Sequence, residues 1–252
     1  MEFYGMTDVG RMRSNNEDSF RMCRLQCGAV LAVVCDGMGG AAGGSQASST
    51  ACETFTNVIL NNENVFIDPE GGLKPKTARS AMLTAVNKAN TAVYNMSVMN
   101  SELTGMGTTL AACLIYKDTV MAVNVGDSRI YAVKDEKATR ISKDHSYVQA
   151  LVDEGVITEE EAENHPKKNI IMRAVGIDDH VETDFFVTAA DMDYILLCSD
   201  GLTSYIGDSA LGDFFGQGTL ENKVTDMVDF ANNSGGSDNI TAVVIDLKGG
   251  NA

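Results

Sequence analysis

This 252-residue chain has no tryptophan, only three prolines and few basic residues. Its 35 aspartates and glutamates outnumber its 19 lysines and arginines, which gives a formal net charge of −16 at pH 7. Binding to a nucleic-acid backbone requires clustered lysine and arginine, so this charge argues against DNA or RNA as the main partner. It does not exclude a phosphorylated substrate, because a few local cations or metal ions can reverse the field inside one cleft.

The chain also lacks an apolar run long enough to cross a bilayer. Its longest apolar stretches, residues 29–35 and 240–245, are far shorter than the roughly 20 residues that a membrane helix requires. The first four residues, Met-Glu-Phe-Tyr, lack the basic start and the apolar core of a signal peptide. We therefore expect a cytoplasmic protein with no membrane insertion.

Six cysteines are present, but they form no Cys-x-x-Cys pair. Cys23 and Cys27 stand four residues apart, and no nearby histidine or further cysteine would complete a zinc site. Cys35, Cys113 and Cys198 lie inside apolar runs, where a free thiol behaves as a small hydrophobic side chain. The cysteines are therefore predicted to be structural, which fits a reducing compartment.

The chain has no low-complexity tract or proline-rich linker, so we expect one domain over residues 1–252. Residues 45–60 and 76–98 carry apolar side chains at helical spacing, and these two helices are predicted to pack together on a sheet. Residues 108–116 and 119–125 predict a hairpin and hence antiparallel pairing. A further helix is predicted over 220–231, and further strands over 2–8, 29–35, 129–133, 182–187, 194–198 and 240–247. This order favours an α+β architecture in which helices cover the sheets.

Four short acidic motifs lie far apart in the chain, each at the end of a strand-like apolar run. They are Asn16-Glu17-Asp18, Asp36-Gly37-Met38-Gly39-Gly40, Ser199-Asp200-Gly201 and Ser237-Asp238-Asn239. Carboxylate and carbonyl oxygens are the ligands that Mg²⁺ and Mn²⁺ prefer, and rigid strand ends hold such groups well. The pattern therefore predicts a site for two divalent metals at the strand ends.

Each aspartate taken alone has a simpler interpretation as a residue that caps a turn or a helix. The acidic balance also suggests a calcium-binding protein without enzymatic activity. However, the sequence contains no Asp-x-Asp-x-Asp-Gly loop with a closing glutamate. The repetition of the motifs favours the two-metal site.

Further motifs extend the pattern, namely Gly10-x-x-Arg13, Gly107-Thr108-Thr109, Gly126-Asp127-Ser128-Arg129 and Asp144-His145-Ser146. Together the motifs span residues 10–239, and their order and spacing resemble those of the metal-dependent protein serine/threonine phosphatases of type 2C, in particular the compact bacterial branch. The resemblance implies an α-β-β-α fold, a β-sandwich of two antiparallel sheets flanked on each side by helices. It also implies that residues 143–175 form the family's flap, a small variable segment beside the active site.

The resemblance assigns metal ligands to individual residues. Asp36 would bridge two divalent ions, Mn²⁺ or Mg²⁺, and the Gly37 carbonyl would bind one of them. Asp200 and Asp238 would hold the other. The glycines that follow Asp36 also have a structural interpretation, because they permit a tight turn that aims the carboxylate inward.

Three further acidic residues complete the expected metal site. Glu17 and Asp18 would act largely through metal-bound waters, whose orientation such groups set. Asp127 matches a position that some bacterial relatives use, together with the equivalent of Asp200, to hold a weaker third metal. A turn-capping aspartate is the competing interpretation of Asp127.

Arg13 is the expected phosphate-binding residue, because the family places an arginine at this motif position and a guanidinium can grip two phosphate oxygens. Its neighbour Arg11 is interpreted as a solvated surface charge. Met38 stands where many eukaryotic members carry histidine, and a thioether cannot give a proton to the leaving alkoxide. The identity of the general acid stays open, since His145 and His165 are expected to be structural.

The resemblance implies hydrolysis of phosphoserine and phosphothreonine on proteins, with a metal-bridging water or hydroxide attacking phosphorus in line. The expected partners are phosphorylated proteins, including a bacterial serine/threonine kinase that the enzyme opposes, and the chain is expected to be a monomer. The alternative is an inactive relative that binds phosphoproteins or acts as a scaffold. Such relatives usually lose metal-site aspartates, and none is missing here.

Overall fold

The computed structural model describes residues 1–39, 43–68 and 70–248. The longer helices are α1 (Gly43–Asn61), α3 (Pro75–Met99) and α7 (Leu220–Asn233), and the shorter ones are α2 (Glu63–Phe66), α4 (Tyr147–Asp153), α5 (Glu159–Glu163), α6 (Asp200–Thr203) and the 3-10 turns η1 (Ser101–Leu103) and η2 (Leu211–Phe215). The strands are β1 (Glu2–Asp8), β2 (Asp18–Arg24), β3 (Val30–Met38), β4 (Gly107–Thr108), β5 (Leu110–Tyr116), β6 (Thr119–Val125), β7 (Arg129–Lys134), β8 (Lys137–Arg140), β9 (Asp184–Ala189), β10 (Tyr194–Cys198) and β11 (Ile240–Asp246).

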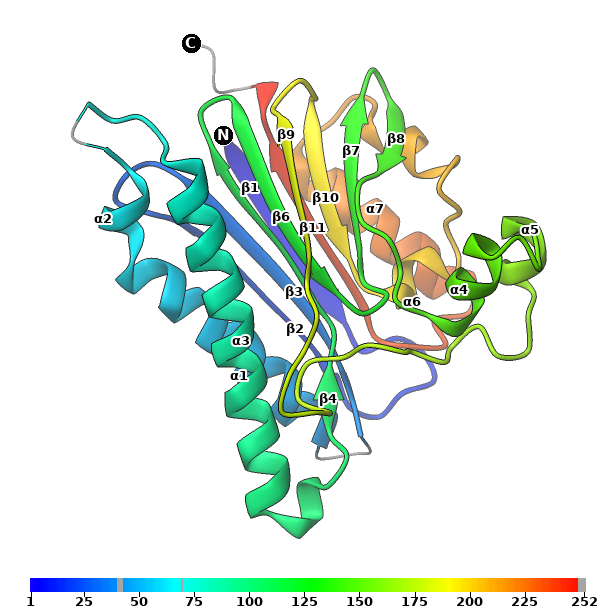
Figure 1. Ribbon diagram of the computed structural model, residues 1–252. Coiled ribbons are helices and arrows are strands. Elements are labelled where there is room, and N and C mark those ends of the chain that lie inside the picture. The colour runs from blue at the N-terminus through cyan, green and yellow to red at the C-terminus, as the bar shows by residue number, and fades with distance from the viewer. Residues whose placement is uncertain (40–42, 69, 249–252) are drawn as a thin grey trace.

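The strands form two sheets that pack face to face, with helices on the outer face of each (Figure 1). The first sheet has the order β1-β11-β10-β7-β8, and the second has the order β2-β3-β5-β6-β9 with the short β4 paired to β3. Neighbouring strands are antiparallel throughout the described pairs. The α-β-β-α sandwich expected from the sequence is therefore confirmed.

Alternation along β3 explains how one strand serves two layers. Leu31 and Val33 belong to the hydrophobic layer between the second sheet and helices α1 and α3. Ala32 and Val34 point the other way, into the layer between the two sheets. Successive side chains of a strand face opposite sides, so a strand that is buried on both faces must be apolar at every position.

A third hydrophobic layer joins the first sheet to α7. Val224, Met227 and Val228 recur at helical spacing and are fully buried against Leu196 of β10 and Val244 of β11. A capping box fixes the start of this helix, because Thr219 and Asn222 bond each other's backbone N–H groups. The apolar face of α7 therefore determines how the helix lies on the sheet.

The predicted helices and hairpin agree with the observed elements within a few residues, but β2 and β8 were not predicted. Both are the outermost strands of their sheets. An edge strand is less buried than a central one, and β8, with the sequence Lys-Ala-Thr-Arg, has little apolar character. The strand predicted over residues 182–187 lies two residues further along, at Asp184–Ala189.

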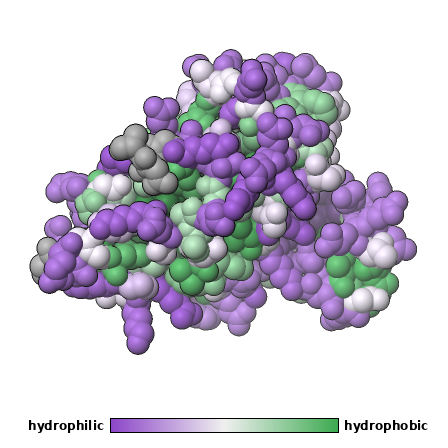
Figure 2. Space-filling view, turned by 90° about the horizontal axis from the view of Figure 1, so that it is seen from above, coloured by the Kyte–Doolittle hydropathy of each residue, from purple (hydrophilic) through white to green (hydrophobic). Residues whose placement is uncertain are grey.

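Residues 143–175, the expected flap, carry only the short helices α4 and α5, which lie at the right-hand side of Figure 1 near α6. The α5 helix has no buried residue and is fixed by a capping box between Thr158 and Glu161. Seen from above, the surface is mainly hydrophilic (Figure 2), in keeping with the high charge of the chain. No helix within the described residues has the length and apolarity to span a membrane.

We expect Phe55→Ala to lower the free energy of unfolding by about 3–5 kcal/mol, because the change leaves a cavity between α1 and the second sheet. Leu60→Ala, in the same helix but 37% exposed, should cost less than about 1 kcal/mol. Urea unfolding followed by circular dichroism measures both values. Equal losses for the two variants would contradict this account of the layer.

Candidate active site

The acidic motifs meet at one end of the sandwich, away from the strand ends that hold Glu2 and Asp246 (Figure 1). Asp18 begins β2 and pairs directly with Asp36, which lies near the end of β3. In an antiparallel pair, the start of one strand lies beside the end of its neighbour. The expectation that every motif follows a strand is thus corrected: Asp18 and Asp238 stand at strand starts, yet they reach the same edge.

The backbone of Asp36 is fixed by two threonines. Its N–H donates to Thr109 Oγ1 at 2.9 Å, and its carbonyl accepts from Thr109 N and Thr108 Oγ1, both at 2.9 Å. At the next position, a Cβ on Gly37 would lie 2.1 Å from the Gly44 carbonyl oxygen, so only glycine fits. Gly40, the last glycine of this motif, lies outside the described residues.

Asp18 is buried and bridges the two sheets. Its Oδ2 accepts hydrogen bonds from Ser199 Oγ at 2.7 Å and Thr241 Oγ1 at 2.6 Å, whereas its Oδ1 is buried with no hydrogen-bond partner. Burial raises the pKa of Asp18 to about 7, and the charges of Asp200 and Asp238 act in the same direction. Ionising this carboxyl group without a nearby cation therefore costs free energy.

Burial and repulsion also raise the pKa values of the other carboxylates in this group. Burial, and then the charge of Asp18, raises the pKa of Asp36 well above its ordinary value. Burial, and then the charge of Asp200, does the same for Asp127, whose Oδ1 is also buried without a partner. Burial and the charge of Asp238 raise the pKa of Asp200, which a hydrogen bond with Asp36 lowers in part. These side chains are thus close enough to repel one another.

Arg13 is one of the cations that face this acidic group. Its Nη2 lies 2.8 Å from Asp238 Oδ2, and its side chain is 51% exposed. Beside it, Glu17 is half-buried, and its backbone N–H donates to Asn239 Oδ1 at 2.7 Å. Burial raises the pKa of Glu17. Arg11, interpreted as a surface charge, is exposed.

A cleft of about 630 Å³ opens beside the acidic group, between the flap and α6. Asp127 and Asp200 line it together with residues of α4 and α5, Arg129 and Arg140, and residues of the segment 203–209. His145 lies at the base of the flap, whereas His165 and His180 form none of the observed bonds to the acidic motifs. The flap therefore borders the same space as the predicted metal ligands.

The donor set fits a hard divalent cation, because it consists of carboxylates and contains buried oxygens that lack partners. In the described part of the chain, no three histidine, cysteine, aspartate or glutamate side chains are already arranged as a metal cage. Asp238 is held by Arg13 at 2.8 Å, and the charges of Asp200 and Asp127 act on Asp36.

Sequence reasoning missed the residues that hold the carboxylates in place. Thr109 and Ser199 belong to recognised motifs, so their importance was signalled although their contacts to Asp36 and Asp18 were not. Thr241 lies inside the apolar run of β11 and gave no signal. Asn239 donates to the carbonyls of Val9 and Asn15 at 2.9 Å, which ties the loop before β2 to the loop before β11.

Comparison with known proteins decides the family. The sequence profile of protein phosphatase 2C matches residues 11–244. The chain belongs to the protein phosphatase 2C family. Its resemblance to the bacterial branch is also confirmed, because the similar proteins come from bacteria such as Listeria, Streptococcus and Mycobacterium.

This 2C-family chain is 35% identical to the serine/threonine phosphatase stp of Listeria monocytogenes serotype 4b, over 95% of this chain and 93% of that protein. It is 36% identical to the serine/threonine protein phosphatase PstP of Mycobacterium tuberculosis, over 98% of this chain but 45% of that protein. Among solved structures, Stp1 from Staphylococcus aureus superposes with a TM-score of 0.89 at 33% identity, over 98% of this chain and 94% of that one.

The stability of the metal-free phosphatase should fall as pH rises from about 4 to about 7. The pKa of Asp18 is about 7 in the folded protein against an ordinary 3.8, so its contribution is fully present below pH 3.8 and is lost as pH rises through 7. The raised pKa values of Asp36 and Asp127 act with the same sign. Urea unfolding in EDTA across this range measures the slope.

Mn²⁺ should reverse this loss, because a cation that binds the folded state alone stabilises it. Asp18→Asn should reduce the pH dependence in EDTA, since it removes one of the titrating groups. A pH-independent stability of the unsubstituted protein would contradict the assignment of the buried carboxylates.

Proposed function

We propose that this 2C-family protein phosphatase hydrolyses phosphoserine and phosphothreonine on proteins, using two divalent cations, Mn²⁺ or Mg²⁺. One observation carries the proposal. Carboxylates from four separate segments converge at one end of the sandwich, where burial and mutual repulsion raise the pKa values of Asp18, Asp36, Asp127 and Asp200. A cation site is the arrangement that makes such a cluster favourable.

The residues that would hold the cations come from different strands and loops. Those proposed as direct ligands are Asp36, the carbonyl of Gly37, Asp200 and Asp238; Glu17 and Asp18 would act through bound waters, and Asp127 would help to hold a weaker third ion. When bound, the cations would lower the pKa of a coordinated water and offset charge on the phosphoryl oxygens.

Arg13 would bind and orient the phosphoryl group. Its guanidinium is half-exposed and lies 2.8 Å from Asp238, so a substrate oxygen can approach it from solvent while the carboxylate fixes its direction. A guanidinium donates two parallel hydrogen bonds to a phosphate, a geometry that an ammonium cannot match. Met38, half-buried beside this site, has no proton to give, so the leaving alkoxide takes its proton from another donor.

The substrates would be phosphorylated proteins, and a serine/threonine kinase of the same cell would be the opposing enzyme. Two relatives carry the name serine/threonine phosphatase over nearly the whole of this chain, which supports this substrate class. An inactive, phosphoprotein-binding relative is disfavoured, since every aspartate expected at the metal site is retained.

The decisive test is hydrolysis of a phosphothreonine peptide by the purified protein in EDTA, Mg²⁺ or Mn²⁺. We expect turnover with either metal and none in EDTA, and Asp36→Asn should reduce turnover to background because it removes a carboxylate charge that would hold the metals. Phosphate release measures the rate. Metal binding without turnover in the unsubstituted protein would instead favour the phosphoprotein-binding alternative.

A second prediction concerns Arg13. Arg13→Ala should lower kcat/KM for the phosphopeptide about 10- to 100-fold, the range expected for loss of charge-assisted hydrogen bonds to phosphate. Arg11→Ala is the matched control, since Arg11 is exposed two residues away, and it should stay within about two-fold of the unsubstituted enzyme. Similar losses in both variants would indicate a general electrostatic effect in place of direct phosphate binding.

A further inference from the structure

The dipeptide Asp144-His145, at the base of the flap, contacts both ends of the turn that carries Asp127. At the first end, the N–H of Gly126 donates to His145 Nδ1 at 3.0 Å, and the N–H of His145 donates to the Gly126 carbonyl at 2.9 Å. The histidine therefore contacts Gly126 through both its ring and its backbone. Two hydrogen bonds thus hold Gly126, the residue that precedes Asp127.

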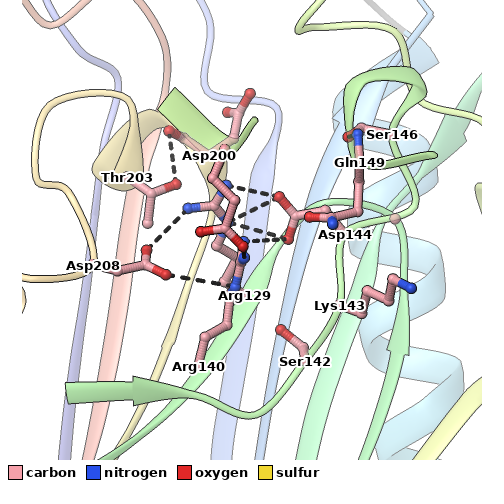
Figure 3. A network of polar contacts seen from close by, with 12 residues as sticks. Arg129, Arg140, Ser142, Lys143, Asp144, Ser146, Gln149, Asp200, Thr203 and Asp208 are labelled. Atoms are coloured by element: carbon pink, nitrogen blue, oxygen red, sulfur yellow. Dashed lines mark hydrogen bonds and ion pairs between the residues drawn. The ribbon is translucent and has the colours of Figure 1, made fainter. Parts of the chain in front are cut away.

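At the other end, Asp144 holds Arg129. Its Oδ2 accepts from Arg129 Nη2 at 2.7 Å and its Oδ1 accepts from Nε at 3.1 Å, and its side chain is only 8% exposed (Figure 3). Paired bonds of this kind fix both the distance and the plane of a guanidinium. Asp144 and His145 thus form hydrogen bonds with the segment 126–129 on either side of Asp127.

The same network extends to the segment that carries Asp200. Arg129 Nη1 lies 3.3 Å from Asp208 Oδ1 (Figure 3). The hydroxyl of Tyr131 donates to the same oxygen at 2.7 Å. Asp208 follows α6, the helix that Asp200 begins. One arginine therefore ties the base of the flap to the turn of Asp127 and to the loop after Asp200.

The turn is also fixed relative to Asp36. A Cβ on Gly126 would lie 2.6 Å from Thr109 Cγ2, so the turn packs directly on this threonine. Ser128 Oγ lies 2.7 Å from Thr109 Oγ1, the atom that accepts the Asp36 N–H. A displacement of the turn would therefore shift Asp36 as well as Asp127.

The chemistry of His145 suits this role. Because the Gly126 N–H donates to Nδ1, that nitrogen carries no proton, and any ring proton is on Nε2, which faces Asp184 Oδ2 at 3.3 Å and Arg173 Nη1 at 3.0 Å. Burial, and then the charge of Arg173, lowers the pKa of His145. The neutral ring is the form that accepts the Gly126 bond.

We propose that Asp144 and His145 are positioning residues that set the place of Asp127 relative to Asp200 and Asp36, and hence the affinity of the site for a divalent cation. Neither residue is among the proposed metal ligands. The proposal rests on the proposed function only in that the acidic cluster binds divalent cations. Partners that orient ligand residues typically change metal affinity by about 10- to 100-fold when they are removed.

The experiment measures Mn²⁺ binding by isothermal titration calorimetry, without substrate. His145→Asn keeps an acceptor near the position of Nδ1, whereas His145→Gln places its amide near Nε2 and leaves Gly126 without that bond. We expect the Gln variant to weaken the weakest Mn²⁺ step about ten-fold or more, and the Asn variant to stay within about three-fold. His165→Gln is the matched control, because His165 accepts a backbone N–H in the same flap but contacts no part of the Asp127 turn.

Asp144→Asn provides an independent test at the other end of the turn and should also weaken Mn²⁺ binding about ten-fold. Circular dichroism in EDTA identifies the variants that fold, and affinities are compared among those. Equal Mn²⁺ affinity in the folded His145→Gln or Asp144→Asn protein and the unsubstituted protein would overturn the proposal. An equal loss in His145→Asn and His145→Gln would also overturn it, because the Gly126 bond would then not be the determinant.

These outcomes are separate from the fate of the proposed function. If the unsubstituted protein binds Mn²⁺ but releases no phosphate from the phosphopeptide, the phosphatase assignment fails while the comparison of affinities still supports or overturns the positioning roles. If it binds no Mn²⁺, both proposals are overturned.

Discussion

Repulsion between buried carboxylates is the constraint on which the rest of this structure depends. Asp18 and Asp127 are buried and Asp36 and Asp200 are half-buried, so water screens their charges poorly and an unpaired charge among them is costly. The fold must supply enough hydrophobic stabilisation elsewhere to keep them together. Three apolar layers meet this requirement, two under the helices and one between the sheets.

The antiparallel sandwich suits such a cluster because it brings the starts and ends of neighbouring strands to one edge. Asp18 and Asp36 come from strands that run in opposite directions, and Asp200 and Asp238 flank a second such pair in the other sheet. Hydroxyl groups then fix the geometry: Thr109 holds the backbone of Asp36, and Ser199 and Thr241 hold the carboxylate of Asp18. Rigid strands and short polar bonds thus share the task of positioning.

The sequence predicted the long elements well, because α1 and α3 have clear helical periods and β3, β5 and β6 are continuously apolar. It missed β2 and β8, whose identity as strands depends on pairing with a neighbour and not on their own residues. The acidic motifs were visible in the sequence, but the partners of Asp18 were not, because Thr241 looks like any other strand residue. Contacts between distant segments, such as Arg13 with Asp238, arise only from the fold.

The hydrogen bonds of Asp18 have a consequence for how the two sheets are joined. Asp18 belongs to one sheet, whereas Ser199 and Thr241 belong to or adjoin the other. Contact within the hydrophobic cluster between the sheets has no preferred direction, so it resists separation more than sliding. The directional hydrogen bonds of Asp18 oppose that sliding. These bonds therefore fix the alignment of the two sheets at the edge where the acidic residues gather.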